Sequence, residues 1–551
     1  MRYSFKIDNP QKHFIQITIE LDVHKDKSVD LQLPSWRPGR YELGDFAKNV
    51  KSFSAKDEFG NNIDFSKIRK DLWRIPSNEH KKLTISYQYY AAELNAGSTW
   101  LDENQLYINP INCCMYNPLS LDEECYLELD LPENYQIATS LTKQDHVLFA
   151  SDFHVLVDSP IICSPTLQIF NYKLQDVNFH VCFQGEVKVN WDKMEKDFIE
   201  FTACQIERFD SFPVNEYYFL FQITPYASYH GVEHQRSTVI LLGPSYAIFK
   251  KNYSKLLGIS SHELYHTWNV KTIRPNDMLP YDYSKENYTE MGYVTEGVTT
   301  YMGDRMLFES GVFSEKDYLK ELGTLLQRHF DNDGRKHYSV AESSFDTWLD
   351  GYVQGIPGRK VSIYVEGALI ALICDARIRK LTQQKRSLHD VMRKMYGGDD
   401  VLKGYDKLSY KELLEDISGT SFNDIYNDLI HGNVDFKNYL ETALNEFGWK
   451  FNKNQSSLIS RRYGIKGIWF NHQYKINSVA EGSSADCSGL IPGDKIHSIN
   501  GYKLNNDLEN WLDYFKNDEV VLSIEREGEL KRMTLSIQNE KQFYNYTVEK
   551  H

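Results

Sequence analysis

The segment SSHELYHTWNVK, residues 260–271, holds the residue types best suited to chemistry in this chain. His262 and His266 stand four positions apart, and Glu263 directly follows the first histidine. On a helix, residues four apart lie on one face, so both imidazoles would point the same way. Two neutral imidazoles at this spacing can bind one Zn²⁺, and the adjacent glutamate is placed to act as a base on water. The alternative is the solvated face of an ordinary surface helix.

A catalytic zinc site needs a third protein ligand and a free position for water. Thirty residues after His266, the segment YVTEGVTTYMGDR places Glu296 near the start of another predicted helix. A carboxylate from a second, crossing helix would complete a site of two histidines and one glutamate. Alternatively, Glu296 is an ordinary carboxylate that the helix dipole favours at a helix start.

Two further segments carry candidate functional residues. SYHGVEHQRSTVILL, residues 228–242, places Glu233 beside a predicted strand, and VSIYVEGALIAL, residues 361–372, places Tyr364 at a predicted helix start. By itself each has a plainer interpretation, because Glu233 would be a solvated loop residue and Tyr364 a core or surface tyrosine.

The elements that must position these residues follow from hydrophobic periodicity. Residues 1–165 alternate apolar and polar positions, as in HFIQITIELDV (13–23) and KLTISYQYY (82–90), which is typical of strands and predicts an all-β first domain. The segment LPSWRPGRYELGDF (33–46) predicts an ordered loop, because proline and glycine interrupt regular structure there.

The rest of the chain predicts two more domains. A few strands and then a series of helices predict a mainly helical α+β domain over 166–455, with helices at 253–271, 294–310, 315–330, 362–380, 387–396, 408–417 and 421–430. After residue 455 short strands return, with one predicted helix at 506–516, so residues 456–545 form a small separate α/β module.

Composition excludes several classes of protein. The 551 residues exceed what one hydrophobic core holds. No apolar run approaches the roughly 18 residues of a membrane span, and the N-terminus lacks the apolar core of a secretory signal, so a cytoplasmic location is expected. No CxxC pair is present, which argues against a disulfide framework or a cysteine-ligated zinc. The net charge of −15 disfavours nucleic acid and anionic membrane as partners.

HELYHTWNVKTIRP followed by VTEGVTTY resembles the PDZ-containing glycyl aminopeptidase family, which are gluzincin zinc metallopeptidases related to aminopeptidase N. The C-terminal segment GSSADCSGLIPGDKIHSING is similar to a PDZ domain. Further family-like blocks occur in the same order: LPSWRPGRYELGDFAKNV (33–50), GVEH (231–234), ESSFDTW (342–348), YVEGALIALICDARIR (364–379) and SLHDVM (387–392). The resemblance implies a multidomain α+β chain with an N-terminal all-β domain, a thermolysin-like, mainly helical catalytic domain and a C-terminal PDZ-like domain.

The resemblance also implies roles for individual residues. His262, His266 and Glu296 would ligate Zn²⁺, and Glu263 would deprotonate the attacking water and return the proton to the leaving amine. Tyr364 matches the tyrosine that donates a hydrogen bond to the developing oxyanion.

Substrate binding is implied for the GVEH segment, at Gly231, Glu233 and His234. Glu233 matches the carboxylate that binds the free α-ammonium of a peptide, so a blocked N-terminus would leave this carboxylate unpaired. The family resemblance alone suggests a preference for small N-terminal residues, Gly or Ala. A peptide C-terminus is a candidate partner of the PDZ-like domain, and a structural cap over the catalytic domain is the alternative.

The chain departs from the family pattern at several places, including Ser484 and Cys487–Ser488 in the PDZ-like segment, where proline and alanine are usual. Glu366 replaces the lysine of the Tyr-x-Lys-Gly motif, and His230 replaces the first glycine of Gly-Gly-Leu-Glu-His, where an imidazole could narrow the first substrate pocket or contact the peptide. The segment YGIKGIWF (463–470) also lacks a clean PDZ carboxylate loop. Two other hypotheses therefore stand beside an aminopeptidase: a PDZ-guided zinc endopeptidase and a catalytically inactive PDZ scaffold.

Overall fold

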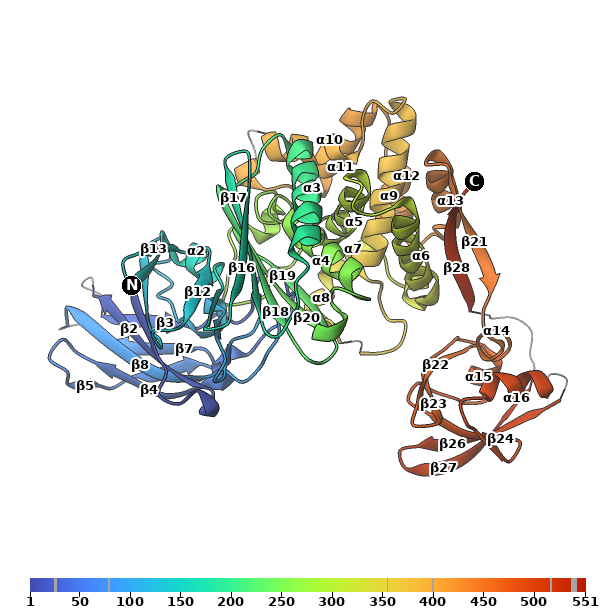
Figure 1. Cartoon of the computed structure of the whole chain (residues 1–551), viewed down its shortest axis with the longest axis horizontal. Coiled ribbons are helices and arrows are strands. Elements are labelled where there is room, and N and C mark those ends of the chain that lie inside the picture. The colour runs from blue at the N-terminus through green and yellow to red at the C-terminus, as the bar shows by residue number, and fades with distance from the viewer. Residues whose placement is uncertain (24–26, 78–79, 354, 399–400, 516–517, 537–542) are drawn as a thin grey trace. The chain divides into compact units, whose positions relative to one another are not determined.

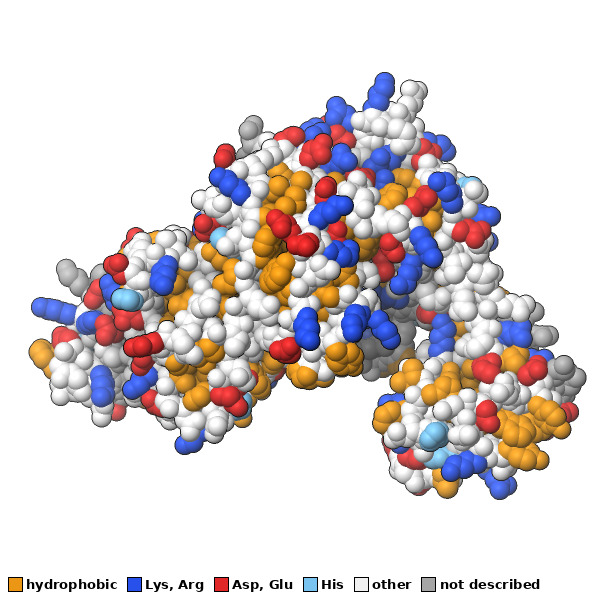
Figure 2. Space-filling model, viewed as in Figure 1, with side chains coloured by type: hydrophobic (Ala, Val, Ile, Leu, Met, Phe, Trp, Pro, Cys, Tyr) orange, Lys and Arg blue, Asp and Glu red, His pale blue; other side chains and the backbone are white. Residues whose placement is uncertain are grey.

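The computed structural model describes residues 1–23, 27–77, 80–353, 355–398, 401–515, 518–536 and 543–551. The chain folds as two units, and each is described by itself. The first unit comprises residues 1–318, 338–354 and 362–434, and the second comprises 319–337, 355–361 and 435–551. Among the described residues, no helix is long and apolar enough to cross a lipid bilayer. Acidic and basic side chains are interspersed over the face seen in Figure 2, so the net charge of −15 forms no single-signed field there.

The first part of the chain is a β-rich region, as its period-two pattern predicts. Strands β2 (Phe14–Asp22) and β8 (Lys82–Tyr90) pair antiparallel over their whole length, and each buries every second residue. They lie at the centre of an eight-stranded sheet of order β13-β14-β11-β1-β2-β8-β4-β5 (Figure 1). The other strands of that sheet are β1 (Arg2–Lys6), β4 (Val50–Lys56), β5 (Asn62–Ile63), β11 (Cys125–Asp130), β13 (Thr142–Gln144) and β14 (Val147–Ala150).

Two smaller sheets complete this region. One has the order β3-β7-β6 and the other β12-β15-β10-β9. Their bounds are β3 (Ser28–Gln32), β6 (Ser66–Arg69), β7 (Leu72–Pro76), β9 (Trp100–Leu101), β10 (Leu106–Ile108), β12 (Gln136–Thr139) and β15 (Ile161–Ser164). The loop after β3 is ordered because Trp36 is fully buried, donates from Nε1 to the carbonyl of Asp282 at 2.7 Å and packs edge-on against Trp348.

A five-stranded mixed sheet follows, with the order β16-β17-β18-β20-β19. Strand β19 (Ser228–Glu233) is at its edge and pairs antiparallel with β20 (Ser237–Gly243). The remaining strands are β16 (Gln168–Leu174), β17 (Val177–Gln184) and β18 (Glu216–Ile223). Helix α3 (Trp191–Phe209) packs against β16 and α4 (Figure 1). This helix was not predicted from the sequence, although its buried apolar residues recur at helical spacing, namely Met194, Phe198, Phe201, Ile206 and Phe209.

Helices carry most of the predicted site. Helix α4 (Tyr253–Tyr265) packs against β19 and β20, and a π-helical turn, η5 (Tyr293–Val298), leads into α5 (Thr299–Glu309). Helices α9 (Ile363–Leu381), α10 (Leu388–Gly397) and α11 (Lys407–Ser418) form within one or two residues of their predicted bounds. The helix predicted over 253–271 ends earlier, because the backbone beyond Tyr265 forms wide turns in which Ile273 donates to the carbonyl of Trp268.

The second unit contains α6 (Glu315–Asp331) from residue 319 onward, α13 (Lys437–Glu446) and a small sheet module. The hairpin of β21 (Trp449–Gln455) and β28 (Tyr544–Lys550) pairs from end to end. Between them lies a sheet of order β22-β23-β24-β26-β27, formed by β22 (Ile465–Phe470), β23 (Gln473–Val479), β24 (Lys495–Ile499), β26 (Val520–Arg526) and β27 (Glu529–Leu535). Helices α14 (Leu458–Tyr463) and α16 (Leu508–Tyr514) share its separate apolar core.

Candidate active site

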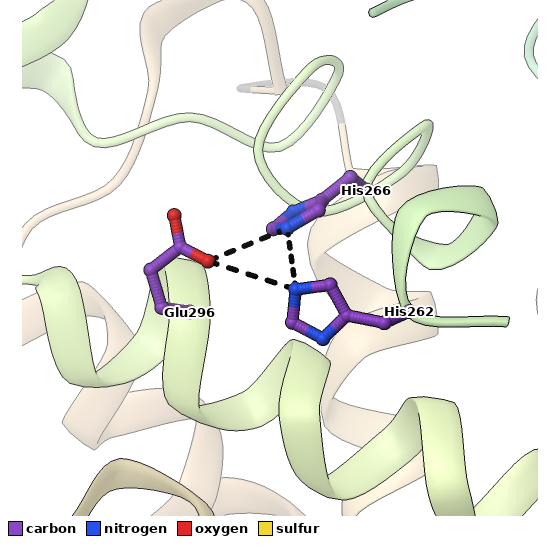
Figure 3. A group of neighbouring side chains, drawn as sticks. All are labelled: His262, His266 and Glu296. Atoms are coloured by element: carbon purple, nitrogen blue, oxygen red, sulfur yellow. Dashed lines mark hydrogen bonds and ion pairs between the residues drawn. The ribbon is translucent and has the colours of Figure 1, made fainter. Parts of the chain in front are cut away.

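The two histidines and Glu296 converge, although they come from separate elements. His262 lies in the last turn of α4, His266 directly follows that helix, and Glu296 lies in η5 (Figure 3). The two histidine Nε2 atoms are 3.0 Å apart. The Oε2 atom of Glu296 is 3.8 Å from Nε2 of His262 and 3.4 Å from Nε2 of His266. Three potential ligand atoms therefore surround one point.

This arrangement fits a zinc ion. Ligand atoms about 2.0–2.1 Å from a tetrahedral zinc lie roughly 3.3 Å from one another, which is close to the three observed separations of 3.0, 3.4 and 3.8 Å. Nδ1 of His266 donates to the carbonyl of Asn269 at 2.7 Å. That hydrogen bond fixes the tautomer of the neutral ring, in which Nε2 is the nitrogen that can ligate a metal ion.

The protonation preferences of the cluster indicate a site with excess negative charge. Burial lowers the pKa of His262, and the neighbouring His266 lowers it further, so this imidazole is neutral. Burial alone would lower the pKa of His266, but the carboxylate of Glu296 outweighs it and raises the pKa to about 10. A divalent cation would displace this proton and neutralise the carboxylates that attract it.

Two sets of close contacts hold the turn after α4, η5 and α9 in place. Asn269 donates from Nδ2 to the carbonyl of Val294 at 2.9 Å and to Oγ1 of Thr299 at 3.0 Å, which ties the turn after α4 to η5. Gly297 and Gly367 lie face to face where η5 crosses α9. A Cβ atom on Gly297 would lie 2.3 Å from the Cα of Gly367, so any side chain here would separate the two helices.

Glu263 and Glu233 form a second, overlapping group with His266. One ligand atom from each of the three residues lies within 4.8 Å of the others. Burial raises the pKa of Glu263, and the charges of Glu233 and Glu296 raise it further. Oε2 of Glu263 and Oε1 of Glu233 are buried and have no hydrogen-bond partner among the described residues. Both carboxylates therefore have unused acceptors in the site.

The GVEH segment lies on the edge strand beside these carboxylates. A Cβ atom on Gly231 would lie 2.2 Å from Oε1 of Glu263, so only glycine lets β19 approach the predicted base this closely. Glu233 is 4% exposed and faces the same cluster. His234 is instead hydrogen-bonded through Nδ1 to Asp158 at 3.1 Å, and its substrate contact stays a prediction.

Tyr364 lies at the start of α9, close to the ligand cluster. Its ring centroid is 6.4 Å from that of His262. Burial raises the pKa of its hydroxyl far above the ordinary value, and the charge of Glu296 raises it further, so the hydroxyl keeps its proton and can donate. Its hydroxyl also interacts with Tyr352.

Loop residues of the β-rich region complete the surroundings of the site. Gly39 has φ of +80° and approaches Glu233 so closely that a Cβ atom there would lie 2.3 Å from Oε2. Arg37 and Tyr41, from the same loop, lie near enough to Glu233 for the charge of its carboxylate to raise their pKa values. From the sequence, this loop was expected to be ordered and to be one of the family-like blocks, without a role for any of its residues in the site. Its Pro38–Gly39 turn is the signal for a close backbone approach, but the partner of that approach lies nearly two hundred residues away.

Three family models match the chain. The Peptidase M61 N-terminal domain matches residues 2–165, the M61 glycyl aminopeptidase matches residues 255–370, and the PDZ domain matches residues 445–538. The two M61 models together cover just over half of the sequence. The chain belongs to the M61 peptidase family. No curated protein matches it.

Solved structures agree with this assignment. An aminopeptidase N family protein from Idiomarina loihiensis has a TM-score of 0.92 at 27% identity, over 100% of this M61 chain and 98% of that chain. An M1 zinc metallopeptidase from Deinococcus radiodurans covers 79% of this chain and 94% of that one at 13% identity, with a TM-score of 0.47. The match to yeast LTA4 hydrolase covers 80% of this chain and 66% of that chain at 13% identity, with a TM-score of 0.46. Neither of these two weaker similarities supports a conclusion about this chain. The M61 family and the Idiomarina protein support an aminopeptidase activity for the chain.

Proposed function

We propose that this M61 peptidase is a zinc-dependent aminopeptidase that hydrolyses the N-terminal peptide bond of unblocked peptides. The observation that carries the proposal is the convergence of two carboxylates, Glu263 and Glu233, on the same cluster as His262, His266 and Glu296. One carboxylate is available for the reacting water and the other for a substrate amine. The preference for Gly at the first position rests on the family description, and Ala is included as the next larger residue.

His262, His266 and Glu296 would hold the zinc, which supplies Lewis acidity to the reacting carbonyl and to water. Glu263 accepts a proton from the attacking water through an oxygen that has no protein partner among the described residues. Its raised pKa makes it a stronger base than an ordinary carboxylate, and it then returns the proton to the leaving amine. A buried base next to the strand at Gly231 is also shielded from competing solvent.

Glu233 binds the α-ammonium of the substrate. Its carboxylate is buried, and one of its oxygens lacks a protein partner among the described residues, so an ammonium ion would satisfy it. Acetylation of the substrate removes that cation and leaves the carboxylate unpaired, which costs binding free energy. Tyr364 donates its hydroxyl proton to the oxyanion that develops on the reacting carbonyl.

The test combines metal content with hydrolysis of four substrates. We expect one zinc per chain by elemental analysis, with turnover of the anilides of Gly, Ala and Leu and none of N-acetyl-Ala-anilide. Glu263→Gln should retain the zinc and lose turnover. Glu290→Gln is the matched control, because Glu290 makes a surface ion pair with Lys407.

Three results would count against the proposal. Absence of zinc in the purified protein would remove its basis. Equal cleavage of acetylated and free substrates would favour an endopeptidase and contradict the role of Glu233. Full activity of Glu263→Gln would assign the base to another residue.

A further inference from the structure

A cavity of about 290 Å³ lies in the first unit, outside the catalytic cluster. The residues assigned to zinc, base, amine and oxyanion binding do not line it. Its walls come from Pro38, from helix α2 (Phe153–Val157) and from the segment 271–283, which follows the turn after α4. Its volume is close to the lower end of the roughly 300–1,000 Å³ of small-molecule sites. The cavity is therefore a second space in which a small ligand would fit.

The charges that line this cavity leave one cation unbalanced. The charged lining residues are Lys271, Arg274 and Asp158. Lys271 donates from Nζ to Oδ1 of Asp158 at 2.7 Å, so these two charges balance each other. The positive charge of Arg274 has no such partner in the lining. An anion in the cavity would supply it.

Arg274 has donors that the protein uses only in part. Its Cζ lies 3.9 Å from the ring centroid of Tyr281, so the ring supports the guanidinium. Nε donates to the carbonyl of Val270 at 3.4 Å, and Nη2 donates to that of Lys271 at 3.3 Å. Within the part of the chain that the structure describes, Nη1 makes no hydrogen bond and the side chain makes no ion pair. A guanidinium supported on an aromatic ring, with donors to spare, suits recognition of a carboxylate.

His154 and Tyr283 add one more donor to the lining. Nδ1 of His154 and the hydroxyl of Tyr283 are 2.8 Å apart. Burial lowers the pKa of His154 against the charges of Asp152 and Asp122, and burial raises the pKa of Tyr283, so the imidazole is neutral and the hydroxyl keeps its proton. The pair thus holds two polar hydrogens, and only one of them lies in the shared hydrogen bond. Whichever group donates there, the other hydrogen has no acceptor among the described residues.

Most of the remaining lining is apolar, namely Pro38, Val155, Val157, Leu279 and Pro280. An apolar or aromatic group would bury this surface, which an inorganic anion could not do. A neighbouring ammonium is disfavoured, because the lining already carries excess positive charge and both oxygens of Asp158 accept hydrogen bonds from the protein. The matching ligand is a carboxylate with an apolar group and no amine beside it.

We infer that this cavity binds a small carboxylate that carries an apolar or aromatic group, with the carboxylate at Arg274 and at the His154–Tyr283 pair. The charge of Arg274 affects the pKa of both His154 and Tyr283, which places the three groups close enough to share one ligand. A free organic acid and the C-terminal residue of a peptide both have this chemistry. The inference goes beyond the proposed function, and its test requires no turnover.

The first measurement is calorimetric titration of the zinc-loaded wild-type protein with 3-phenylpropionate and with its amide. We expect the acid to bind with a Kd of about 1 mM or lower, as ligands of this size allow. The amide should bind at least about tenfold more weakly, because it loses the charge-assisted hydrogen bonds. N-acetyl-phenylalanine and its amide distinguish the two sources, since only a site for a peptide C-terminus would bind this acid as tightly as 3-phenylpropionate.

Arg274→Met should weaken binding of the acid by about tenfold to hundredfold and give acid and amide similar Kd values. Arg274→Lys should keep part of the difference. Val155→Phe fills the cavity without removing a charge, and it should abolish binding of the acid. Arg2→Met is the matched control, because Arg2 also lies over a tyrosine ring, that of Tyr126 at 4.7 Å, and its Kd should equal that of the wild type.

Zinc content and circular dichroism establish that each variant is folded. If Arg274→Met does not fold, Arg274→Lys and Val155→Phe still decide the question. No binding of the acid to the folded wild type, or equal binding of acid and amide, would overturn the inference. An affinity that is unchanged in the Arg274 and Val155 variants would place the carboxylate elsewhere, at the zinc for example, and would overturn it as well.

Inorganic phosphate provides a further comparison, because it offers negative charge without an apolar group. Phosphate that binds as tightly as 3-phenylpropionate would contradict the role of the apolar lining. Failure of the proposed function has a different signature, namely no zinc and no turnover of Gly-anilide. The calorimetric result does not depend on either, so the two failures are distinguishable.

Discussion

At the scale of single residues, the site depends on buried polar groups that the protein leaves partly unpaired. The buried oxygens of Glu263 and Glu233 that lack a partner among the described residues would each be costly in a structural core. They face one cluster, and a metal ion and a peptide would satisfy all of them. Such concentrations of unsatisfied groups are typical of binding sites.

Tyr364 provides the residue-scale prediction. Tyr364→Phe removes one donor to the oxyanion and leaves the ring in place, so kcat should fall by about 10²–10³ while KM changes little. Zinc content should stay at the wild-type value, because the hydroxyl is not one of the three ligands. Tyr288→Phe, at a half-exposed tyrosine, is the control. A variant with unchanged kcat would show that another group stabilises the oxyanion.

At the scale of elements, the ligands converge because the helices cross closely. A Cβ atom on Gly367 would lie 2.6 Å from the carbonyl oxygen of Tyr293 and 2.7 Å from the Cα of Gly297. These are backbone atoms, which cannot rotate away as a side chain could. The spacing of η5 and α9 therefore sets where Glu296 lies relative to the histidines.

Gly367→Ala should weaken zinc binding and lower the melting temperature, because the methyl group forces η5 and α9 apart. We expect a loss of about 1–3 kcal/mol in stability, which is the usual cost of overpacking. Gly258→Ala is the control on α4, since its Cβ atom would meet nothing nearer than Oδ1 of Asp304 at 3.8 Å. Thermal unfolding and zinc titration measure both variants, and equal behaviour of the two would contradict the packing argument.

Asp158 links three elements near the site. Its carboxylate accepts hydrogen bonds from Nζ of Lys271 at 2.7 Å, from Nδ1 of His234 at 3.1 Å and from the backbone N–H of Gln235 at 2.8 Å. Burial alone would raise the pKa of Asp158, but the charge of Lys271 and the bond from His234 outweigh it and lower the pKa. The turn after α4 and the end of β19 are thereby joined to the β-rich region.

Asp158→Asn should destabilise the protein by about 3 kcal/mol at pH 7, because Lys271 is left buried without its partner. The folded pKa of Asp158 is depressed, so its contribution is fully present above the unfolded pKa of about 3.9 and is lost as pH falls below that value. The difference in melting temperature between wild type and variant should therefore narrow below about pH 4. Asp30→Asn, at a surface ion pair with Arg74, should have a melting temperature close to that of the wild type both at pH 7 and below about pH 4. A difference that stays constant with pH would refute the assigned ion pair.

At the scale of the whole molecule, the PDZ-like module is an insertion with adjacent ends. Gln455 and Tyr544 are paired across the β21–β28 hairpin, and Oγ of Ser456 donates to the carbonyl of Phe543 at 2.5 Å. The module has an apolar core of its own, and its strand β22 is at a sheet edge where a peptide strand could add. Binding of a peptide C-terminus there remains a proposal, and a structural cap remains the alternative.

Replacement of residues 457–542 by Asn-Gly should therefore leave the catalytic residues folded, because a two-residue turn closes an antiparallel hairpin. We expect kcat/KM for Gly-anilide to change by no more than about twofold, as for removal of a separately folded insertion. Higher KM values for long peptides alone would support capture of their C-termini by the module. Loss of anilide turnover in a folded, zinc-containing variant would instead show that the module contributes to the catalytic site.

Much of this organisation can be predicted from sequence, because it depends on local patterns. The alternation in β2 and β8 follows from burial of one face of a sheet, and the periodicity of α9 and α11 predicts those helices within a residue or two. Helix α3 was not predicted, although its buried apolar residues recur at helical spacing between strand-like segments.

By itself the sequence determined which reactive residues are present: two histidines one helical turn apart, a glutamate beside them that can act as a base, and a carboxylate thirty residues later. Only the tertiary structure decided that Glu296 meets the histidines, that Gly39 packs against Glu233 and that Arg37 contacts His230. The reason is that periodicity reports which face of an element is buried and not which distant element covers it. The contacts of Arg37 with Gly97 and His230 span 60 and 193 positions, and no local pattern encodes such pairings.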